Sequence, residues 1–221
     1  INAMLDKVNL DVEFIQGQRV TDENVMDIVE MVLSGSVNKD LSACLSAHGI
    51  HAVGLSGKDS NLLKAEKKYV AGKDGSKLDL GYVGQIKEVN KNLLHDLINA
   101  EYVPIISPVA SGFNGETFNV NADYVAGAVS GALEAEKLIL LTDVRGLLRD
   151  ARDETTLIQQ VRVSEIPGLI KDGVIRGGMI PKIDCGRWRR CAPASTPPSF
   201  STAASPTPSS SSFSPTRAWA P

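Results

Sequence analysis

The fold is decided by residues 118–146, which read FNVNADYVAGAVSGALEAEKLILLTDVRG. Asn121 is a favourable N-cap for a helix, and Asp123 lies in its first turn, where a carboxylate meets the positive end of the helix dipole. The short apolar run 138–141 predicts a buried parallel strand that ends in a turn. Because ligands of parallel α/β folds bind at helix N-termini and at the carboxyl ends of strands, Asp123 and Asp143 lie where a site is expected.

Helical and extended patterns alternate on both sides of this stretch, which predicts an α/β fold with a largely parallel sheet and hairpin excursions. Thr21 suits an N-cap and Gly35 is a stop signal, so one helix is predicted to end before the next begins. Residues 64–79 predict a β-hairpin, and Asn114-Gly115 predicts the turn of another. Further helices are predicted at 2–8, 37–47, 93–100 and after Ser164, further strands at 12–15, 51–55, 81–89, 102–106 and 157–161, and a turn at 16–17.

The loop after the strand at 51–55 resembles a phosphate-binding loop only in part. Residues 56–59 read Ser-Gly-Lys-Asp and follow a buried strand, as a P-loop does. Ala52 stands where the first glycine of that motif is required, and Asp59 stands where serine or threonine is required. We therefore reject a P-loop here, although the small residues allow the backbone to approach a ligand.

Charge and composition exclude several classes of function. The 221 residues carry a net charge of −3 with a pI near 5.7, which gives no electrostatic footprint for nucleic acid or an anionic membrane surface. No stretch is long and apolar enough to span a membrane. The three cysteines and three histidines lack the spacing of a metal site, so we predict no metal held by protein ligands. A reducing cytoplasm is the predicted location, with an organelle as the open alternative.

Residues 187–221 differ abruptly from the rest of the chain. They contain no Asp, Glu, Lys, Leu, Ile or Val, and Ser, Pro, Ala and Thr dominate. Such a segment cannot bury enough apolar surface to offset its ordering entropy, so we predict a disordered tail. One interpretation is a natural Pro/Ser linker. We prefer an aberrant tail produced by a change of reading frame, because the shift falls inside a helical pattern.

Five short motifs occur in a recognisable order and spacing, at residues 14–22, 31–39, 118–123, 138–146 and 177–182. Together they resemble the N-acetylglutamate kinases of the amino-acid kinase family. The resemblance covers residues 1 to about 185 and implies a three-layer αβα sandwich with a mainly parallel sheet, incomplete in this chain. It implies an acetylglutamate-binding lobe at 1–135 and the start of a nucleotide-binding lobe at 136–186.

The activity that the resemblance implies is ATP-dependent phosphorylation of the side-chain carboxylate of N-acetyl-L-glutamate, the second step of arginine biosynthesis. A carboxylate nucleophile has a pKa of about 4.3 and is ionised at neutral pH, so no general base is required. The difficulty lies in bringing this anion up to a polyanion, since like unit charges about 4 Å apart repel by about 4 kcal/mol at an effective dielectric of about 20. Such a site must concentrate positive charge and hold the reacting groups in line.

The resemblance also implies roles for four residues. Lys182 matches a lysine that stabilises the transferred phosphoryl group, and Asp123 matches the residue that orients such lysines. Arg19 matches the arginine that binds a substrate carboxylate, and Asn119 matches the asparagine that hydrogen-bonds the substrate. Without the resemblance, Lys182 and Arg19 would be interpreted as solvated surface residues and Asp123 as a partner of the helix dipole.

Two further segments match the parts of the family that line the nucleotide. ATP and Mg²⁺ are the implied cofactors, with Mg²⁺ held mainly by the ATP phosphates and not by a cage of carboxylates. On its position alone, Asp143 is equally a turn residue after a strand. The residues implied for the nucleotide are Thr142, Asp143, Val144, Arg145, Gly146, Leu147, Leu148, Val174, Ile175, Arg176 and Gly178.

The chain departs from the family in two motifs. A strand ending in Lys-x-Gly-Gly, whose lysine contacts the transferred phosphoryl group, and a His-Gly-Gly-Gly-Pro loop are absent from the sequence. We therefore expect a chain truncated at both ends, with weak or absent activity. The alternatives are a non-catalytic fragment that binds acetylglutamate or self-associates, and a sister kinase that acts on aspartate, glutamate or carbamate. Because family members form homodimers, or hexamers built from dimers, the resemblance implies a homodimer.

Overall fold

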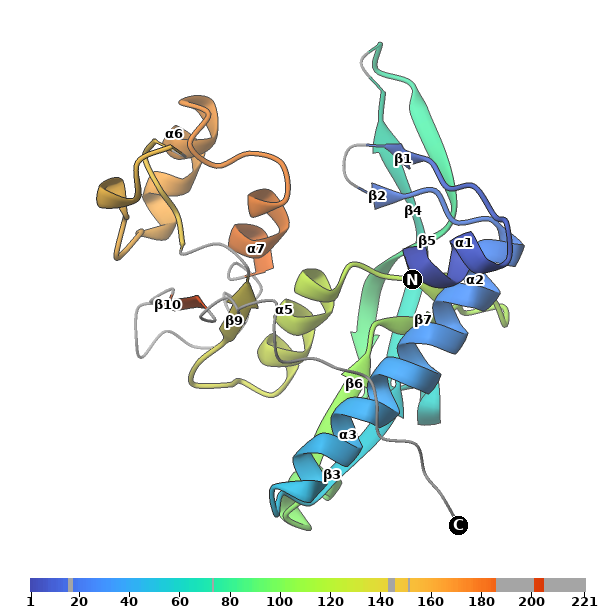
Figure 1. The fold of residues 1–221 in the computed structure, drawn as a ribbon. Coiled ribbons are helices and arrows are strands. Elements are labelled where there is room, and N and C mark those ends of the chain that lie inside the picture. The colour runs from blue at the N-terminus through green and yellow to red at the C-terminus, as the bar shows by residue number, and fades with distance from the viewer. Residues whose placement is uncertain (16–17, 73, 143–145, 151, 186–200, 205–221) are drawn as a thin grey trace. The chain divides into compact units, whose positions relative to one another are not determined.

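The structure is a computed structural model, and it describes residues 1–15, 18–72, 74–142, 146–150, 152–185 and 201–204 (Figure 1). The chain divides into two compact units, each described by itself below. In the described part, unit 1 holds Ile1–Leu138 and residues 176–185, and unit 2 holds Ile139–Ile175 and residues 201–204. The predicted turn at 16–17 lies outside the described residues, as does the predicted tail apart from residues 201–204.

Unit 1 alternates helices with strands, which confirms the predicted α/β fold. Its strands are β1 Phe14–Ile15, β2 Gln18–Arg19, β3 Ala52–Ser56, β4 Leu63–Ala71, β5 Lys77–Val89, β6 Val103–Ser107, β7 Val109–Ser111 and β8 Thr117–Asn119. Its helices are α1 Asn2–Lys7, α2 Glu23–Glu30, the π-helix η1 Met31–Val37, α3 Asn38–Ala47, the 3-10 turn η2 Asp59–Asn61, α4 Lys91–Asn99, α5 Ala122–Ala132 and α7 Met179–Cys185.

The strands of unit 1 pair in both directions. β3 and β6 are parallel, with Gly54 opposite Ile105. The long β4–β5 hairpin is antiparallel, and these two strands close a small barrel with β8 and β7. The second hairpin, β7–β8, brackets the predicted Asn114-Gly115 turn, and Gly115 adopts a positive φ of 94° there. Both predicted hairpins are therefore confirmed.

The helix predicted to stop at Gly35 continues, and this prediction was wrong. α2, η1 and α3 follow one another without a break from residue 23 to residue 47, seen as the long blue helix in Figure 1. A glycine inside a helix costs only about 1 kcal/mol, and packing of the neighbouring turns offsets that cost. The N-cap is Asp22 and not Thr21, because the Asp22 carboxylate accepts the N–H of Val25 at 2.8 Å.

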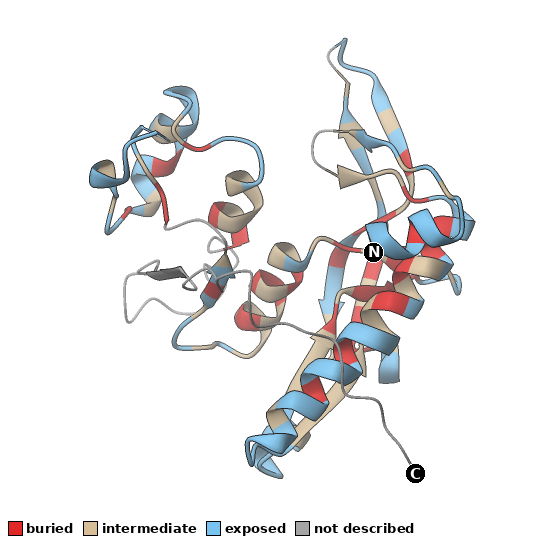
Figure 2. Cartoon of the chain, in the orientation of Figure 1, coloured by how far each residue is buried: buried red, intermediate tan, exposed pale blue. Residues whose placement is uncertain are grey.

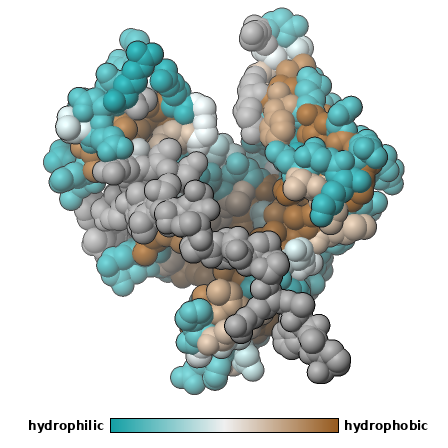
Figure 3. Space-filling view, in the orientation of Figure 1, coloured by the Kyte–Doolittle hydropathy of each residue, from teal (hydrophilic) through white to brown (hydrophobic). Residues whose placement is uncertain are grey.

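Two apolar clusters form the core of unit 1 (Figure 2). The larger one packs the barrel strands against α4 and α5 through Leu63, Leu94 and Val125. The smaller one packs α1 on α2 through Leu5 and Val29. Figure 3 shows that part of the surface is apolar. On the long helix, the exposed large apolar side chains are those of Met31, Val37 and Leu41.

Unit 2 holds few regular elements among its described residues. They are β9 Ile139–Thr142, the 3-10 turns η3 Glu154–Thr156 and η4 Val163–Glu165, α6 Ile166–Lys171 and β10 Ser201–Ala204. β9 pairs in parallel with β10, and β10 lies inside the segment 187–221 that was predicted to be disordered.

Two predictions fail in unit 2. The apolar run at 138–141 predicted a buried strand, but only Leu140 is buried and Leu141 is 76 % exposed, because among the described residues β9 pairs with one strand only, β10. The strand predicted at 157–161 is reduced to a single bridge between Leu148 and Leu157, since no strand in the described part of the chain pairs with the rest of this segment. No helix among the described residues is long and apolar enough to cross a membrane.

Candidate functional site

The N-terminus of α5 positions Asp123. The side chain of Asn121 caps the helix by accepting the backbone N–H groups of Asp123 and Tyr124, at 2.9 and 3.4 Å. This cap was predicted from the sequence, because an asparagine directly before a helical run supplies that acceptor. Asp123 then projects from the first turn with its carboxylate mostly covered, 18 % exposed.

Lys182 reaches Asp123 from α7. Its ammonium Nζ lies 3.2 Å from both carboxylate oxygens of Asp123. The close approach of α7 to α5 depends on Gly127, because a Cβ added there would lie 2.7 Å from the backbone oxygen of Cys185. The structure thus brings together Lys182 and Asp123, which are separated by 59 residues in the sequence.

Arg19 lies on β2, and only part of its guanidinium group is hydrogen-bonded. Nη2 donates to Asn2 Oδ1 at 2.7 Å, and Cζ lies 4.7 Å from the centre of the Phe14 ring. Nη1 is buried and has no hydrogen-bond partner. Burial lowers the pKa of Arg19 from its usual value. A buried donor without a partner costs free energy, so this guanidinium edge is suited to an anionic ligand.

Asn119 is linked to Arg19 through Thr21. Asn119, the last residue of β8, donates from Nδ2 to Thr21 Oγ1 at 3.3 Å. The same hydroxyl donates to the backbone oxygen of Arg19 at 3.0 Å. Thr21 is fully buried and was missed as part of this region, since the sequence presented it as an N-cap. The two residues predicted for the substrate therefore lie at either end of one short polar chain.

The residues predicted to line the nucleotide fall in both units. Asp143, Val144 and Arg145 lie outside the described residues. In unit 2, Leu147 and Ile175 are buried. Gly146 of unit 2 is buried as well, while Thr142 at the end of β9, Leu148 and Val174 are half-buried. Arg176 and Gly178 belong to unit 1 and are exposed.

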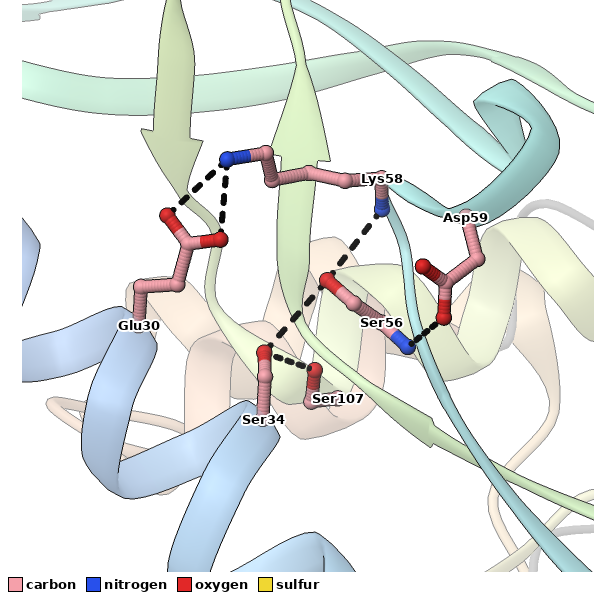
Figure 4. A network of polar contacts seen from close by, with 6 residues as sticks. All are labelled: Glu30, Ser34, Ser56, Lys58, Asp59 and Ser107. Carbon is pink, nitrogen blue, oxygen red and sulfur yellow. Dashed lines mark hydrogen bonds and ion pairs between the residues drawn. The ribbon is translucent and has the colours of Figure 1, made fainter.

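A second polar cluster lies at the carboxyl ends of β3 and β6 and was not predicted (Figure 4). Ser34 of the π-helix η1 makes hydroxyl contacts of 2.7 Å with Ser107 and 3.4 Å with Ser56. Beside it, Lys58 is paired with Glu30 at 2.8 Å. Every group has a partner here, so the cluster joins the long helix to both strand ends. No sequence signal identified it, because only the fold brings three distant serines together.

A surface pocket of about 500 Å³ lies beside the two hairpins, lined by Tyr82, Phe113 and Phe118 among others. None of the predicted site residues lines this pocket. Among the described residues, no group of three or more His, Cys, Asp or Glu side chains is placed to hold a metal ion. The candidate site is therefore built on the Asp123–Lys182 pair and on Arg19 with Asn119.

This chain belongs to the amino acid kinase family, whose model matches residues 1–187. Within that class, two curated relatives of this chain carry the name acetylglutamate kinase. It is 47 % identical over 189 residues to the acetylglutamate kinase of Heliobacterium modesticaldum, covering 84 % of this chain and 64 % of the relative. It is 46 % identical over 187 residues to the acetylglutamate kinase of Methanopyrus kandleri, covering 85 % and 76 %.

Two solved structures are similar to this chain. A Streptococcus mutans UA159 protein superimposes with a TM-score of 0.73 at 30 % identity, over 86 % of this chain and 73 % of that one. An N-acetylglutamate synthase from Neisseria gonorrhoeae, complexed with coenzyme A and N-acetyl-glutamate, superimposes with a TM-score of 0.64 at 22 % identity, over 84 % and 41 %. The second likeness shows the fold alone. The chain spans less than two thirds of the Heliobacterium relative's length.

Proposed function

We propose that this chain belongs to a protein that phosphorylates the side-chain carboxylate of N-acetyl-L-glutamate with ATP, a step of arginine biosynthesis. The observation that carries the proposal is the Asp123–Lys182 contact of 3.2 Å at the N-terminus of α5. This contact supports the roles that the resemblance implies, with Lys182 stabilising the phosphoryl group and Asp123 orienting the lysine. Identity of 46–47 % to proteins named acetylglutamate kinase supports the choice of substrate.

The residues of this chain would act by charge and position. Lys182 supplies positive charge that offsets the repulsion between the substrate carboxylate and the phosphates of ATP. Asp123 fixes the direction of the Lys182 ammonium group. The carboxylate of Asp123 accepts a hydrogen bond from Lys182 and is therefore not placed to act as a general base. This agrees with the proposed reaction, because its carboxylate nucleophile is already ionised and requires no base. In this proposal Arg19 presents its unpaired Nη1 to a carboxylate of the substrate, and Asn119 donates a hydrogen bond to the substrate.

ATP would supply the transferred phosphoryl group, with Mg²⁺ on its phosphates. Among the described residues, the mostly covered ammonium of Lys182 suits such a polyanion. The residues proposed to line the nucleotide are those implied by the resemblance, from Thr142 to Leu148 and from Val174 to Arg176, with Gly178. A homodimer and a cytoplasmic location stay predictions.

Trapping the acyl phosphate with hydroxylamine tests the proposal. In a full-length version of the protein, we expect hydroxamate to form from N-acetyl-L-glutamate and not from glutamate, aspartate or carbamate. In the same version, Lys182→Ala should lower kcat far more than it raises the KM for acetylglutamate. Equal changes in kcat and KM would count against the role given to Lys182. Preference for one of the other substrates would establish a sister kinase.

Acetylglutamate binding without turnover is the second candidate function. It is favoured by one observation: the buried Nη1 of Arg19 has no hydrogen-bond partner among the described residues, and it can bind a carboxylate whether or not a phosphoryl group is transferred. Saturable binding of acetylglutamate with no hydroxamate formed by the 221-residue chain would select this candidate. Any turnover by that chain that is lost in Lys182→Ala would exclude it.

A further inference from the structure

The ammonium group of Lys68 has no ion-pair partner in the part of the chain that the structure describes. It lies on β4, is half-buried, and its Nζ sits 4.7 Å from the centre of the Tyr124 ring. Among the described residues it makes no hydrogen bond or ion pair. Burial lowers its pKa from the usual value, which means that the fold disfavours the charge it carries at neutral pH.

The neighbouring lysines of the same strand are all satisfied. Lys67 is paired with Asp79 at 2.7 Å, and Lys64 donates to the backbone oxygen of Gly112 at 2.9 Å. Lys64 also lies over an aromatic ring, that of Phe113, at 5.7 Å. Lys64 and Lys68 thus share a strand, partial burial and an aromatic contact, and they differ in that only Lys64 has an acceptor.

The ring under Lys68 belongs to the residue that follows Asp123. Tyr124 is in the first turn of α5, next to the carboxylate that holds Lys182. Burial and the charges of Asp184 and Asp123 raise the pKa of Tyr124, so its phenol stays neutral and its ring remains a good platform for a cation. Two ammonium groups therefore contact adjacent residues of one helical turn.

The helix terminus offers little positive charge of its own to a ligand. Asn121 Oδ1 accepts the N–H groups of Asp123 and Tyr124, and its backbone oxygen accepts that of Val125. An anion at this turn must therefore be bound by side chains. Lys182 already shares its charge with Asp123, whereas Lys68 is paired with no carboxylate among the described residues.

We propose that Lys68, held over the Tyr124 ring, is a second anion-binding lysine of this site and takes a phosphate group of a polyphosphate chain. The proposal rests on the function proposed above and adds to it a residue outside all five motifs of the resemblance. It explains why the fold keeps a partly desolvated ammonium without a counter-charge, since a bound phosphate would supply that charge.

Calorimetric titration of the 221-residue chain with inorganic tripolyphosphate tests this, with Lys64→Met as the matched control for Lys68→Met. We expect Lys68→Met to weaken tripolyphosphate binding about tenfold, the usual loss for one charge-assisted contact. Lys64→Met should leave the affinity unchanged, and Lys68→Arg, which keeps the charge, should restore most of it. In urea unfolding, Lys68→Met should raise the midpoint or leave it in place, because a disfavoured charge is removed.

Two results would overturn the proposal. One is that the unmodified chain does not bind tripolyphosphate. The other is equal tripolyphosphate affinity in Lys68→Met and the unmodified chain; if the urea midpoint of Lys68→Met is also lower, Lys68 is a structural partner of Tyr124. Titration with N-acetyl-L-glutamate separates this failure from that of the proposed function. If acetylglutamate binds and Lys182→Met weakens tripolyphosphate binding while Lys68→Met does not, only the role of Lys68 is lost.

Discussion

Gly127 shows how one residue controls the distance between two groups of the candidate site. It lies on α5 where α7 passes, and a Cβ at this position would lie 2.8 Å from the Cβ of Cys185. Cys185 is in the same short helix as Lys182, so any shift of α7 also moves the ammonium away from Asp123. We expect Gly127→Ala to lower the free energy of unfolding by about 1–3 kcal/mol, the usual cost of overpacking.

Urea unfolding monitored by circular dichroism checks this prediction. Gly168→Ala is the control, because Gly168 also lies in a helix and a Cβ there would meet no atom within 4 Å. A replacement of glycine by alanine in open helical space should be neutral or slightly stabilising. If the two variants unfold at the same urea concentration, Gly127 does not set the spacing of α5 and α7.

At this scale, sequence reasoning succeeded where the signal was local or came from a motif. Asn121 was found as an N-cap because the cap and the helix are adjacent in the chain. Lys182 and Asp123 were paired by resemblance only, since no periodicity links residues 59 positions apart. Sequence reasoning did not identify Lys68 as a candidate anion-binding residue. That role is inferred from its contact with the Tyr124 ring and from the lack of an acceptor among the described residues, and both are known only from the folded structure.

The long helix α2–η1–α3 is attached to the parallel strands by side chains of its π-helical and following turns. Asn38 Nδ2 donates to the backbone oxygens of Leu55 and Ile105, one in each strand. Gly54 leaves room for this contact, because a Cβ there would overlap Asn38 Oδ1 and lie 2.7 Å from Ser42 Oγ. The helix therefore packs on β3 at a position that only glycine can occupy.

Two glycine replacements on these elements should have opposite effects. We expect Gly54→Ala to lower the free energy of unfolding by about 1–3 kcal/mol, because Asn38 and Ser42 must move. Gly35→Ala should raise it by up to about 1 kcal/mol, since nothing lies within 4 Å and alanine restricts the unfolded chain. Thermal unfolding of the two variants side by side gives the sign, and a destabilised Gly35→Ala would show that the π-helix requires glycine.

The hydroxyl cluster at the strand ends gives a second prediction for these elements. Ser107 is 4 % exposed and contacts Ser34 Oγ at 2.7 Å, so Ser107→Ala should cost about 1 kcal/mol of unfolding free energy. Ser36→Ala is the control, because Ser36 is exposed on the same π-helix. Chemical denaturation of both variants measures the difference. Equal stability would mean that the cluster does not join the helix to β6.

Sequence patterns predicted the elements better than their ends. The apolar spacing before Gly35 and after Val37 is helical, and helices formed there. The stop signal at Gly35 failed because contacts of Ser34 and Asn38 with the strands hold the turns on either side of it. The strand expected at 157–161 failed for the opposite reason, since the pattern was present but no partner strand was.

For the whole molecule, several carboxylates make stability depend on pH. A hydrogen bond from Lys67 holds the pKa of Asp79 below its usual value, and the hydroxyl of Thr155 does the same for Asp153. A carboxyl group whose pKa is lower in the folded state stabilises the fold above its unfolded pKa, about 4, and loses this contribution as the pH falls through its folded pKa. The urea midpoint should therefore fall as the pH drops from about 5 to about 3.

Asp79→Asn tests the origin of this dependence. The variant should lose stability at neutral pH and show a shallower fall towards low pH, because one of the groups that take up a proton on unfolding has been removed. Lys67→Met should flatten the same part of the curve by removing the ion-pair partner. A curve with the unmodified slope in both variants would assign the pH dependence to other groups.

The central claim is that unit 1 binds N-acetyl-L-glutamate through Arg19, and calorimetric titration of the chain with that compound tests it most directly. Arg19→Gln is the variant and Arg149→Gln, an exposed arginine of unit 2, is its control. We predict saturable binding that is weakened about 10- to 100-fold in Arg19→Gln and unchanged in Arg149→Gln, since a charge-assisted pair contributes about 1.5–3 kcal/mol. No binding by the unmodified chain, or equal affinity in Arg19→Gln, would contradict the account.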